Sequence, residues 1–172
     1  MAIELDNVDL RLLAELERDA DRPNVELARL IGLSPAASLN RVKRLKSSGA
    51  IAGVRARLDP AAVGFPLRVH VAATLANHEE GTDRRFEAAV RRIPQVTSGD
   101  WVTGETDALL EVVARDVEEL QRVLTMLSRA GAQRLLTLLR LRELKPSSPL
   151  PLEPDGRAPG HAVEGARTTG RR

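Results

Sequence analysis

Hydrophobic residues near the N-terminus recur at the spacing of a helix face and predict two helices. The first begins after Asp6, a favourable N-cap, and carries negative charge in its first turn at Asp9. Its hydrophobic stripe consists of Leu5, Val8, Leu12, Leu13 and Leu16. The second helix is short, is capped by Asn24, and ends at Gly32 because glycine is favoured just past a helix end. Its inward positions are Leu27, Ala28 and Ile31.

A third helix and a short strand follow this pair. Ser34-Pro35 supplies an N-cap and a proline at the first helical position, which predicts a helix running to about Ser48. Gly49 ends the helix, and the residues expected to face inward are Leu39, Val42 and Leu45. Residues 51–58 then predict a short strand that carries two arginines.

Beyond the turn-rich segment 59–66, which we interpret as a domain boundary, the pattern changes to alternation. Residues 67–75 alternate as in a strand with one buried face. Asp116, with Glu119 three residues on, predicts a helix that continues to about Arg129. The other predicted elements are a helix at 83–92 and strands at 96–103, 108–114 and 135–141. The order β-α-β-β-α-β is the ferredoxin-like arrangement, so the predicted fold class is α+β.

Composition adds a tail and a cellular setting to this picture. The segment from 146 to 172 is rich in Pro, Gly, Ser and Arg, and from about residue 153 we expect it to be disordered because it cannot offset its ordering entropy. The chain contains no cysteine, no signal-peptide pattern and no apolar run long enough for a membrane span. We therefore expect a cytoplasmic protein with no membrane association, no cofactor and no metal.

Positive charge is concentrated in one short segment. Residues 27–57 contain seven basic residues and no acidic one, whereas residues 1–26 contain three arginines and eight acidic residues. A local basic segment of this kind is typical of a surface that binds a polyanion. A solvated basic helix face would give the same composition, and charge alone leaves both interpretations open.

The second and third helices, joined by a tight glycine-containing turn, are typical of a helix-turn-helix. With the hydrophobic positions turned inward, the free face of the third helix is predicted to hold Ala36, Ala37, Ser38, Asn40, Arg41 and Arg44. Arg41 suits guanine and Asn40 suits adenine in the major groove. Arg44, Lys43 and Lys46 are placed to hold phosphates, and Ser34 at the helix N-terminus can hold another. The alternative is a three-helix domain that packs or dimerises without binding nucleic acid.

Several motifs, in matching order and spacing, resemble the leucine-responsive regulator/asparagine regulator (Lrp/AsnC) family over about residues 4–152. In the first half they are Leu5-Asp6 with Asp9, Asn24-Val25-Glu26-Leu27-Ala28, Gly32-Leu33-Ser34-Pro35, Arg41-Val42-Lys43-Arg44-Leu45 and Gly49-Ala50-Ile51. In the second half they are Leu58-Asp59-Pro60 with Gly64, Val102-Thr103-Gly104 with Asp107, and Leu141-Arg142-Glu143-Leu144-Lys145.

The resemblance implies a transcriptional regulator that binds promoter DNA through a winged helix-turn-helix at residues 1–52. A strand and linker at 53–66 lead to a ferredoxin-like domain at 67–145, which senses an amino acid or related metabolite. That domain also builds homodimers, which assemble into tetramers or octamers. The effector is expected between dimers, against Trp101, Val102, Thr103, Gly104, Glu105, Thr106 and Asp107. The last strand is expected to contribute Leu136, Thr137 and Leu138.

The residues at 101–107 also have side chains suited to an amino acid: Glu105 and Asp107 can bind its ammonium group, and Trp101 can pack against an apolar side chain. A plain hairpin turn is the alternative. Two departures from the family pattern bear on the effector's identity. The chain has no tyrosine where the family often has one, near Thr106, and residues 130–133 lack the usual Gly-Val step.

Two rival functions share this architecture. Siroheme decarboxylases have the same two-part build, but the chain's histidines, at positions 70, 78 and 161, show no metal-ligand spacing. The other rival is a ligand sensor that has lost DNA binding, which the basic third helix argues against. A DNA-binding regulator without enzymatic activity is therefore the leading hypothesis.

Overall fold

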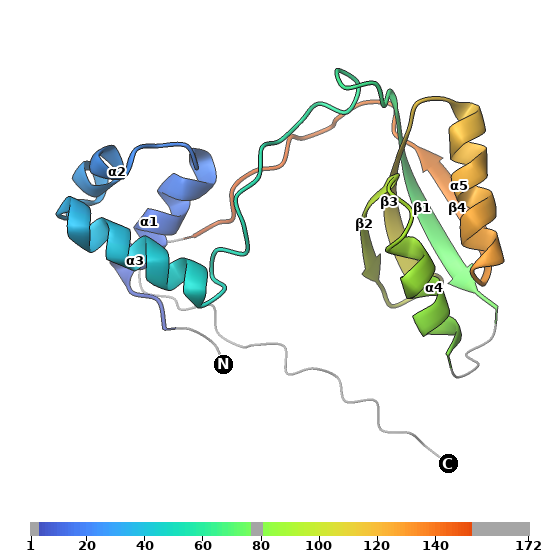
Figure 1. The fold of residues 1–172 in the computed structure, drawn as a ribbon, viewed down its shortest axis with the longest axis horizontal. Coiled ribbons are helices and arrows are strands. Elements are labelled where there is room, and N and C mark those ends of the chain that lie inside the picture. Colours follow the sequence, from blue (N-terminus) through green and yellow to red (C-terminus); the bar gives the residue numbers. More distant parts are fainter. Residues whose placement is uncertain (1–3, 77–80, 153–172) are drawn as a thin grey trace, which may run out of the picture. The chain divides into compact units, whose positions relative to one another are not determined.

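The first of two compact units consists of residues up to Ala56 together with the segment that begins at Pro146, in a computed structural model that describes residues 4–76 and 81–152 (Figure 1). This first unit contains α1 (Asn7–Arg18), α2 (Asn24–Ile31) and α3 (Pro35–Ser47). Two of the predicted caps are confirmed. Asp6 and Asp9 form a reciprocal capping box at the start of α1, and Ser34 Oγ accepts the Ala37 N–H at 3.2 Å.

The predicted cap of α2 is wrong. Asn24 is the first helical residue, Pro23 occupies the N-cap position, and no side chain caps this helix. Asn24 instead donates from Nδ2 to the Pro35 carbonyl at 2.8 Å, which joins the start of α2 to the start of α3. Gly32 ends α2 with a φ of 75°, a left-handed conformation that glycine adopts at low cost.

The core of the first unit differs from the predicted one on α3. Leu12, Leu27, Ile31 and Leu45 form the buried cluster, and Val42 packs against it. Leu39 was expected to face inward but is 43% exposed, whereas Ser38 is completely buried. Because successive helical residues turn by about 100°, Ser38 lies almost in line with Leu45 seven positions later, and Leu39 points well away from both.

The strand predicted at residues 51–58 is absent. These residues adopt no regular secondary structure, and the side chains of Val54 and Leu58 are 59% and 66% exposed. A strand requires a neighbour that completes its hydrogen-bond ladder, and no strand of the described residues pairs with this segment. The expected wing is therefore not formed within the described chain.

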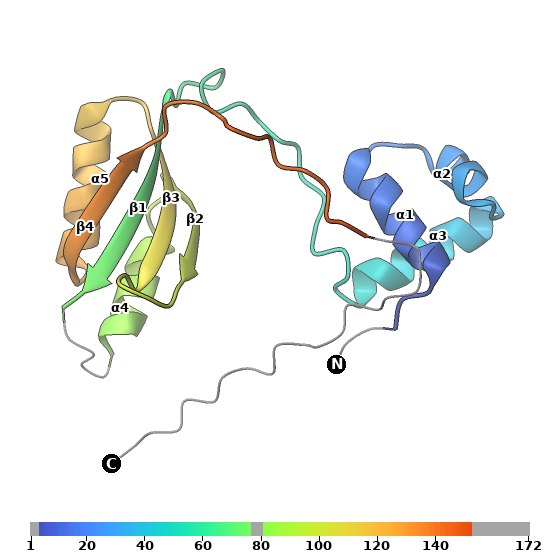
Figure 2. The ribbon, with the colours of Figure 1, turned by 180° about the vertical axis from the view of Figure 1, so that it is seen from behind.

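The second unit, Arg57–Lys145, has the predicted β-α-β-β-α-β order. Its elements are β1 (Leu67–Leu75), α4 (Thr82–Val90), β2 (Val96–Trp101), β3 (Ala108–Ala114), α5 (Val117–Arg129) and β4 (Ala132–Leu139). The strands form one antiparallel sheet in the order β2-β3-β1-β4. Both helices cover the same face of this sheet (Figures 1 and 2).

The core of the second unit lies between that sheet face and the two helices. It includes Val69 and Val71 from β1, Phe86 from α4, Val112 from β3 and Leu127 from α5. β4 begins three residues before its predicted start, because residues 132–134 pair with the end of β1 although they are not a hydrophobic run. Alternate residues of β1, β3 and β4 point to the opposite face.

Among the described residues, every helix falls short of the length and hydrophobicity that a membrane crossing requires. These residues also contain no group of three or more His, Cys, Asp or Glu side chains placed to hold a metal ion. The predicted disordered tail from residue 153, and two of the three histidines, at 78 and 161, lie outside the described residues.

Candidate nucleic-acid interface and effector loop

One side of α3 faces away from the core of the first unit. The exposed residues on this side are Ala36, Leu39, Asn40, Lys43, Lys46 and Ser47, and Arg44 on its flank is exposed as well. Most of these side chains are short, and the only charges among them are positive. The α3 N-terminus adds the positive end of the helix dipole, which attracts anions. This surface therefore offers a narrow ridge with an amide, two ammonium groups and a helix N-terminus.

The predicted DNA-binding residues are divided by the structure into three groups. Ser34, Asn40, Lys43 and Lys46 are exposed, and Ala37 is half-buried. Ser38 has no exposed surface, so its prediction as a DNA contact is corrected: a side chain sealed in the interior cannot touch a duplex. Arg41 and Arg44 form the third group: Arg41 is half-buried and Arg44 is exposed, but both guanidinium groups are engaged within the unit.

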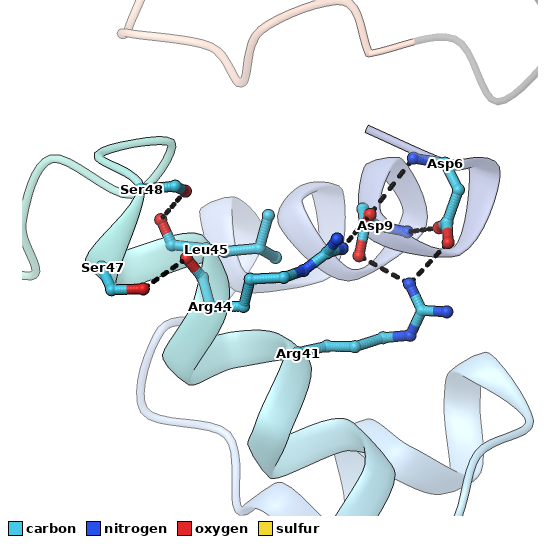
Figure 3. Close-up of polar contacts among 7 residues, drawn as sticks. All are labelled: Asp6, Asp9, Arg41, Arg44, Leu45, Ser47 and Ser48. Atoms are coloured by element: carbon cyan, nitrogen blue, oxygen red, sulfur yellow. Dashed lines mark hydrogen bonds and ion pairs between the residues drawn. The ribbon is translucent and has the colours of Figure 1, made fainter. Parts of the chain in front are cut away.

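Arg41 and Arg44 reach from α3 to the start of α1, where they meet Asp6 and Asp9 (Figure 3). Arg41 Nη1 donates to Asp6 Oδ2 at 2.6 Å and to Asp9 Oδ1 at 2.8 Å. Arg44 Nη2 donates to the other oxygen of Asp9. We call these four residues the Asp–Arg network. It joins positions more than 30 residues apart in the sequence.

Asp9 is the centre of the network. Its side chain is 0% exposed, yet its carboxylate receives both arginines and also the Asp6 backbone N–H at 3.1 Å. A buried carboxylate is costly unless its oxygens are saturated by charged and neutral donors, and here both are. The two arginines therefore provide the charge that allows Asp9 to be buried between α1 and α3.

The network also shifts the titration of its exposed members. Desolvation alone would raise the pKa of Asp6, but hydrogen bonds from Arg41 and from the Asp9 N–H outweigh it and lower the pKa below 3.8. Hydrogen bonds to Asp6 and then Asp9 raise the pKa of Arg41. Since Asp6 has a lower pKa when folded, its contribution to stability is complete above the unfolded pKa and is lost as the pH falls through the folded pKa.

Changing Asp6 to Asn should therefore lower stability at pH 7 and have a smaller effect at an acidic pH below the folded pKa of Asp6. Asparagine remains a good N-cap, so the variant removes the charge while retaining the helix start. Urea unfolding monitored by circular dichroism at both pH values gives the difference in midpoint between variant and wild type. A difference that is equal at the two pH values would show that the Asp6 charge contributes nothing.

The loop between β2 and β3 is held against the end of β1. The Leu75 N–H donates to Asp107 Oδ2 at 2.8 Å, and the Asp107 N–H donates to the Ala73 carbonyl at 3.0 Å. The first of these bonds satisfies an N–H at the irregularity between Thr74 and Leu75. One oxygen of Asp107 is thus used structurally, and the exposed residues of the loop are Val102, Thr103, Gly104 and Glu105.

The other predicted effector residues lie on separate surfaces. Trp101 is half-exposed and lies on the helix-covered side of the sheet, where its ring centroid is 6.0 Å from that of Phe86. Both residues line a groove of about 540 Å³ between α4 and β2. Leu136 and Leu138 are 45% and 50% exposed, pair with β1, and project from the opposite face of the sheet. Thr137, between them in the strand, points the other way. A single chain does not bring these residues into one site.

Both units match known protein families. Residues 5–46 match the AsnC-type helix-turn-helix domain, and residues 68–150 match the Lrp/AsnC ligand binding domain. The leucine-responsive regulatory protein of Haemophilus influenzae is 34% identical over 151 residues, which cover 87% of this chain and 91% of that protein. The regulator AldR of Mycolicibacterium smegmatis is 39% identical over 121 residues, covering 70% of this chain and 71% of AldR.

Solved structures give the same result for the fold. The transcriptional regulator NMB0573 of Neisseria meningitidis, in complex with L-Met, superimposes with a TM-score of 0.81 at 32% identity. The match covers 87% of this chain and 97% of that one. The relatives named here are regulators of transcription, and none supports the siroheme decarboxylase alternative. The chain therefore belongs to the Lrp/AsnC family and is a transcriptional regulator with a helix-turn-helix domain and a ligand-binding domain.

Proposed function

We propose that this regulator reads specific DNA sequences with the exposed side of α3, and that an amino acid or related metabolite modulates its DNA binding or assembly. The observation that carries the proposal is the exposed side of α3 itself, which presents Asn40, Lys43 and Lys46 within a segment of 31 residues, 27–57, that has no acidic residue. An acid-free basic ridge on a helix suits the major groove and its flanking phosphates.

Each exposed residue has a role in this proposal. Asn40 pairs with an adenine edge, and the small Ala37 allows close approach to the bases. Lys43 and Lys46 hold phosphates, and Ser34 with the α3 N-terminus holds another. Residues 1–52 carry DNA binding and residues 53–66 link them to the second unit. Residues 67–145 sense the ligand, and 146–172 form a tail.

For the effector, the L-Met complex of NMB0573 and the names of the leucine-responsive relatives favour an amino acid. Glu105 is exposed and suits an α-ammonium group, and Gly104 allows close backbone approach. The predicted residues of the β2–β3 loop and of β4 do not meet within one chain. We infer that a second copy completes the site where two homodimers meet, in a tetramer or octamer.

Selection from a random-sequence DNA pool by the full-length chain tests the DNA half of the proposal. A twofold protein predicts enrichment of a pseudo-palindromic site, with half-site centres one helical turn apart or a multiple of it. Recovery of the unselected base composition after several rounds would contradict sequence-specific binding. The enriched duplex then serves as the probe for the variants described below.

Changing Gly104 to Val should abolish the effector response while DNA affinity is retained. Gly104 has a φ of 126°, which a β-branched residue adopts only under strain, although no neighbouring atom would block its Cβ. A thermal-shift screen against the twenty amino acids identifies the ligand, which raises the apparent Tm of the wild type. The rise in apparent Tm that this ligand causes is then compared between the variant and the wild type. A normal response in the variant would exclude this loop.

A further inference from the structure

We propose that Arg41 and Arg44 are positioning residues, which hold α3 in place through Asp6 and Asp9, and that neither arginine contacts DNA. The inference rests on the proposed DNA-binding function of α3 and assigns its basic residues to two different tasks. Lys43 and Lys46 face the duplex, whereas the two arginines face α1. Residue type alone would have favoured the arginines as DNA contacts, since Arg is the commonest partner of guanine.

The direction of the side chains carries the first part of the inference. Taking about 100° per residue, Arg41 lies about 40° from the buried Leu45, while Lys43 lies about 160° from it. Arg41 is accordingly 30% exposed, and its guanidinium points at the start of α1 (Figure 3). To reach the DNA major groove, which would face the opposite side of α3, the Arg41 guanidinium would first have to break its hydrogen bonds to α1.

The partners of the arginines carry the second part. Asp9 is fully buried and uses both of its oxygens on Arg41 and Arg44. If the arginines moved to DNA, Asp9 would keep only one backbone N–H donor for a buried negative charge. Two carboxylates and two guanidinium groups also cancel one another's charge. The network therefore favours a fixed orientation of α3 and adds little to the attraction of phosphates.

The salt dependence of DNA binding separates the two tasks. Each phosphate contact contributes about 0.9 to the magnitude of the slope of log K against log salt concentration. The slope therefore counts phosphate contacts, whereas the affinity at one salt concentration also falls when α3 is poorly oriented. With the enriched duplex as probe, Lys43→Gln should reduce the magnitude of this slope by about 0.9 for each copy of α3 on the duplex, which is about 1.8 for a dimer on two half-sites. Arg41→Gln and Arg44→Gln should leave the slope at the wild-type value even where they weaken binding. A reduction of about 0.9 per bound copy in either arginine variant would overturn the proposal.

A measurement without DNA tests the same network independently. Thermal unfolding of the full chain is followed for Asp6→Asn, Arg41→Gln and the double variant. Because the two side chains act on each other, the double variant should lose no more Tm than Arg41→Gln alone. Additive losses would show that the pair is not coupled and would overturn the inference. Failure of the wild type to enrich any duplex would instead contradict the proposed function, and the Tm comparison would still test the network.

Discussion

Replacing Asn40 and Lys43 together by Ala should weaken binding to the enriched duplex on the order of 100-fold at physiological salt. Asn40 is expected to supply a paired contact to a base, worth about 1–3 kcal/mol of discrimination. Lys43 is expected to supply a phosphate contact that acts on all sequences alike. Both side chains are exposed on α3 and lie outside the core of the first unit, so the fold should be unchanged.

Fluorescence anisotropy with the enriched duplex and a scrambled duplex measures both effects. Asn40→Ala alone should lower the ratio of the two affinities, and Lys43→Ala alone should lower both affinities and keep their ratio. A matched control, Gln133→Ala with Lys145→Ala, removes the same amide and ammonium groups from exposed positions of the second unit. If the control loses as much affinity as the α3 variant, the interface is not on α3.

Replacing Asp9 by Ala should destabilise the first unit by about 3 kcal/mol, because it removes a buried carboxylate that is shared by two arginines. The change also removes one half of the capping box at the start of α1. The partly exposed arginines can turn to water, which keeps the loss at the lower end of the range for a broken buried ion pair.

The chain's single tryptophan separates the two units in this experiment. Trp101 belongs to the second unit, whereas circular dichroism also reports the helices of the first. In urea, Asp9→Ala should shift part of the circular dichroism transition and leave the fluorescence transition in place. The control is Glu17→Ala on the same helix, since Glu17 is exposed and has no ion-pair partner among the described residues. Equal shifts in the two variants would mean that the buried charge is not important.

The elements that the sequence predicted well are those set by neighbouring residues. Helix starts at Asp6, Ser34 and Asp116 depend on a side chain that reaches a backbone N–H three residues on, and all three were predicted correctly. The order of strands and helices in the second unit followed from the hydrophobic period together with such local start signals. The strand predicted at 51–58 fails because strand formation depends on a distant partner, which local alternation does not reveal.

The buried face of α3 was assigned incorrectly because, at two adjacent positions, the polar residue is buried and the hydrophobic residue is exposed. Ser38 is buried and Leu39 is exposed, so a rule that turns hydrophobic residues inward rotates the helix. The Asp–Arg network was missed because it joins residues far apart in sequence. A signal existed nevertheless: Asp6 and Asp9 have the same spacing of three as Arg41 and Arg44, and each pair shares a helix face.

The most direct test of the central claim is to locate α3 on DNA. Because the chain has no cysteine, a single cysteine can be placed at Leu39, which is exposed on α3, and labelled with a DNA-cleaving iron chelate. Cysteine at Glu17 on α1 provides the comparison. We expect the Leu39 position to cut the enriched duplex within its two half-sites and the Glu17 position to leave those half-sites uncut. Cleavage of the half-sites from Glu17 and not from Leu39 would contradict an interface on α3.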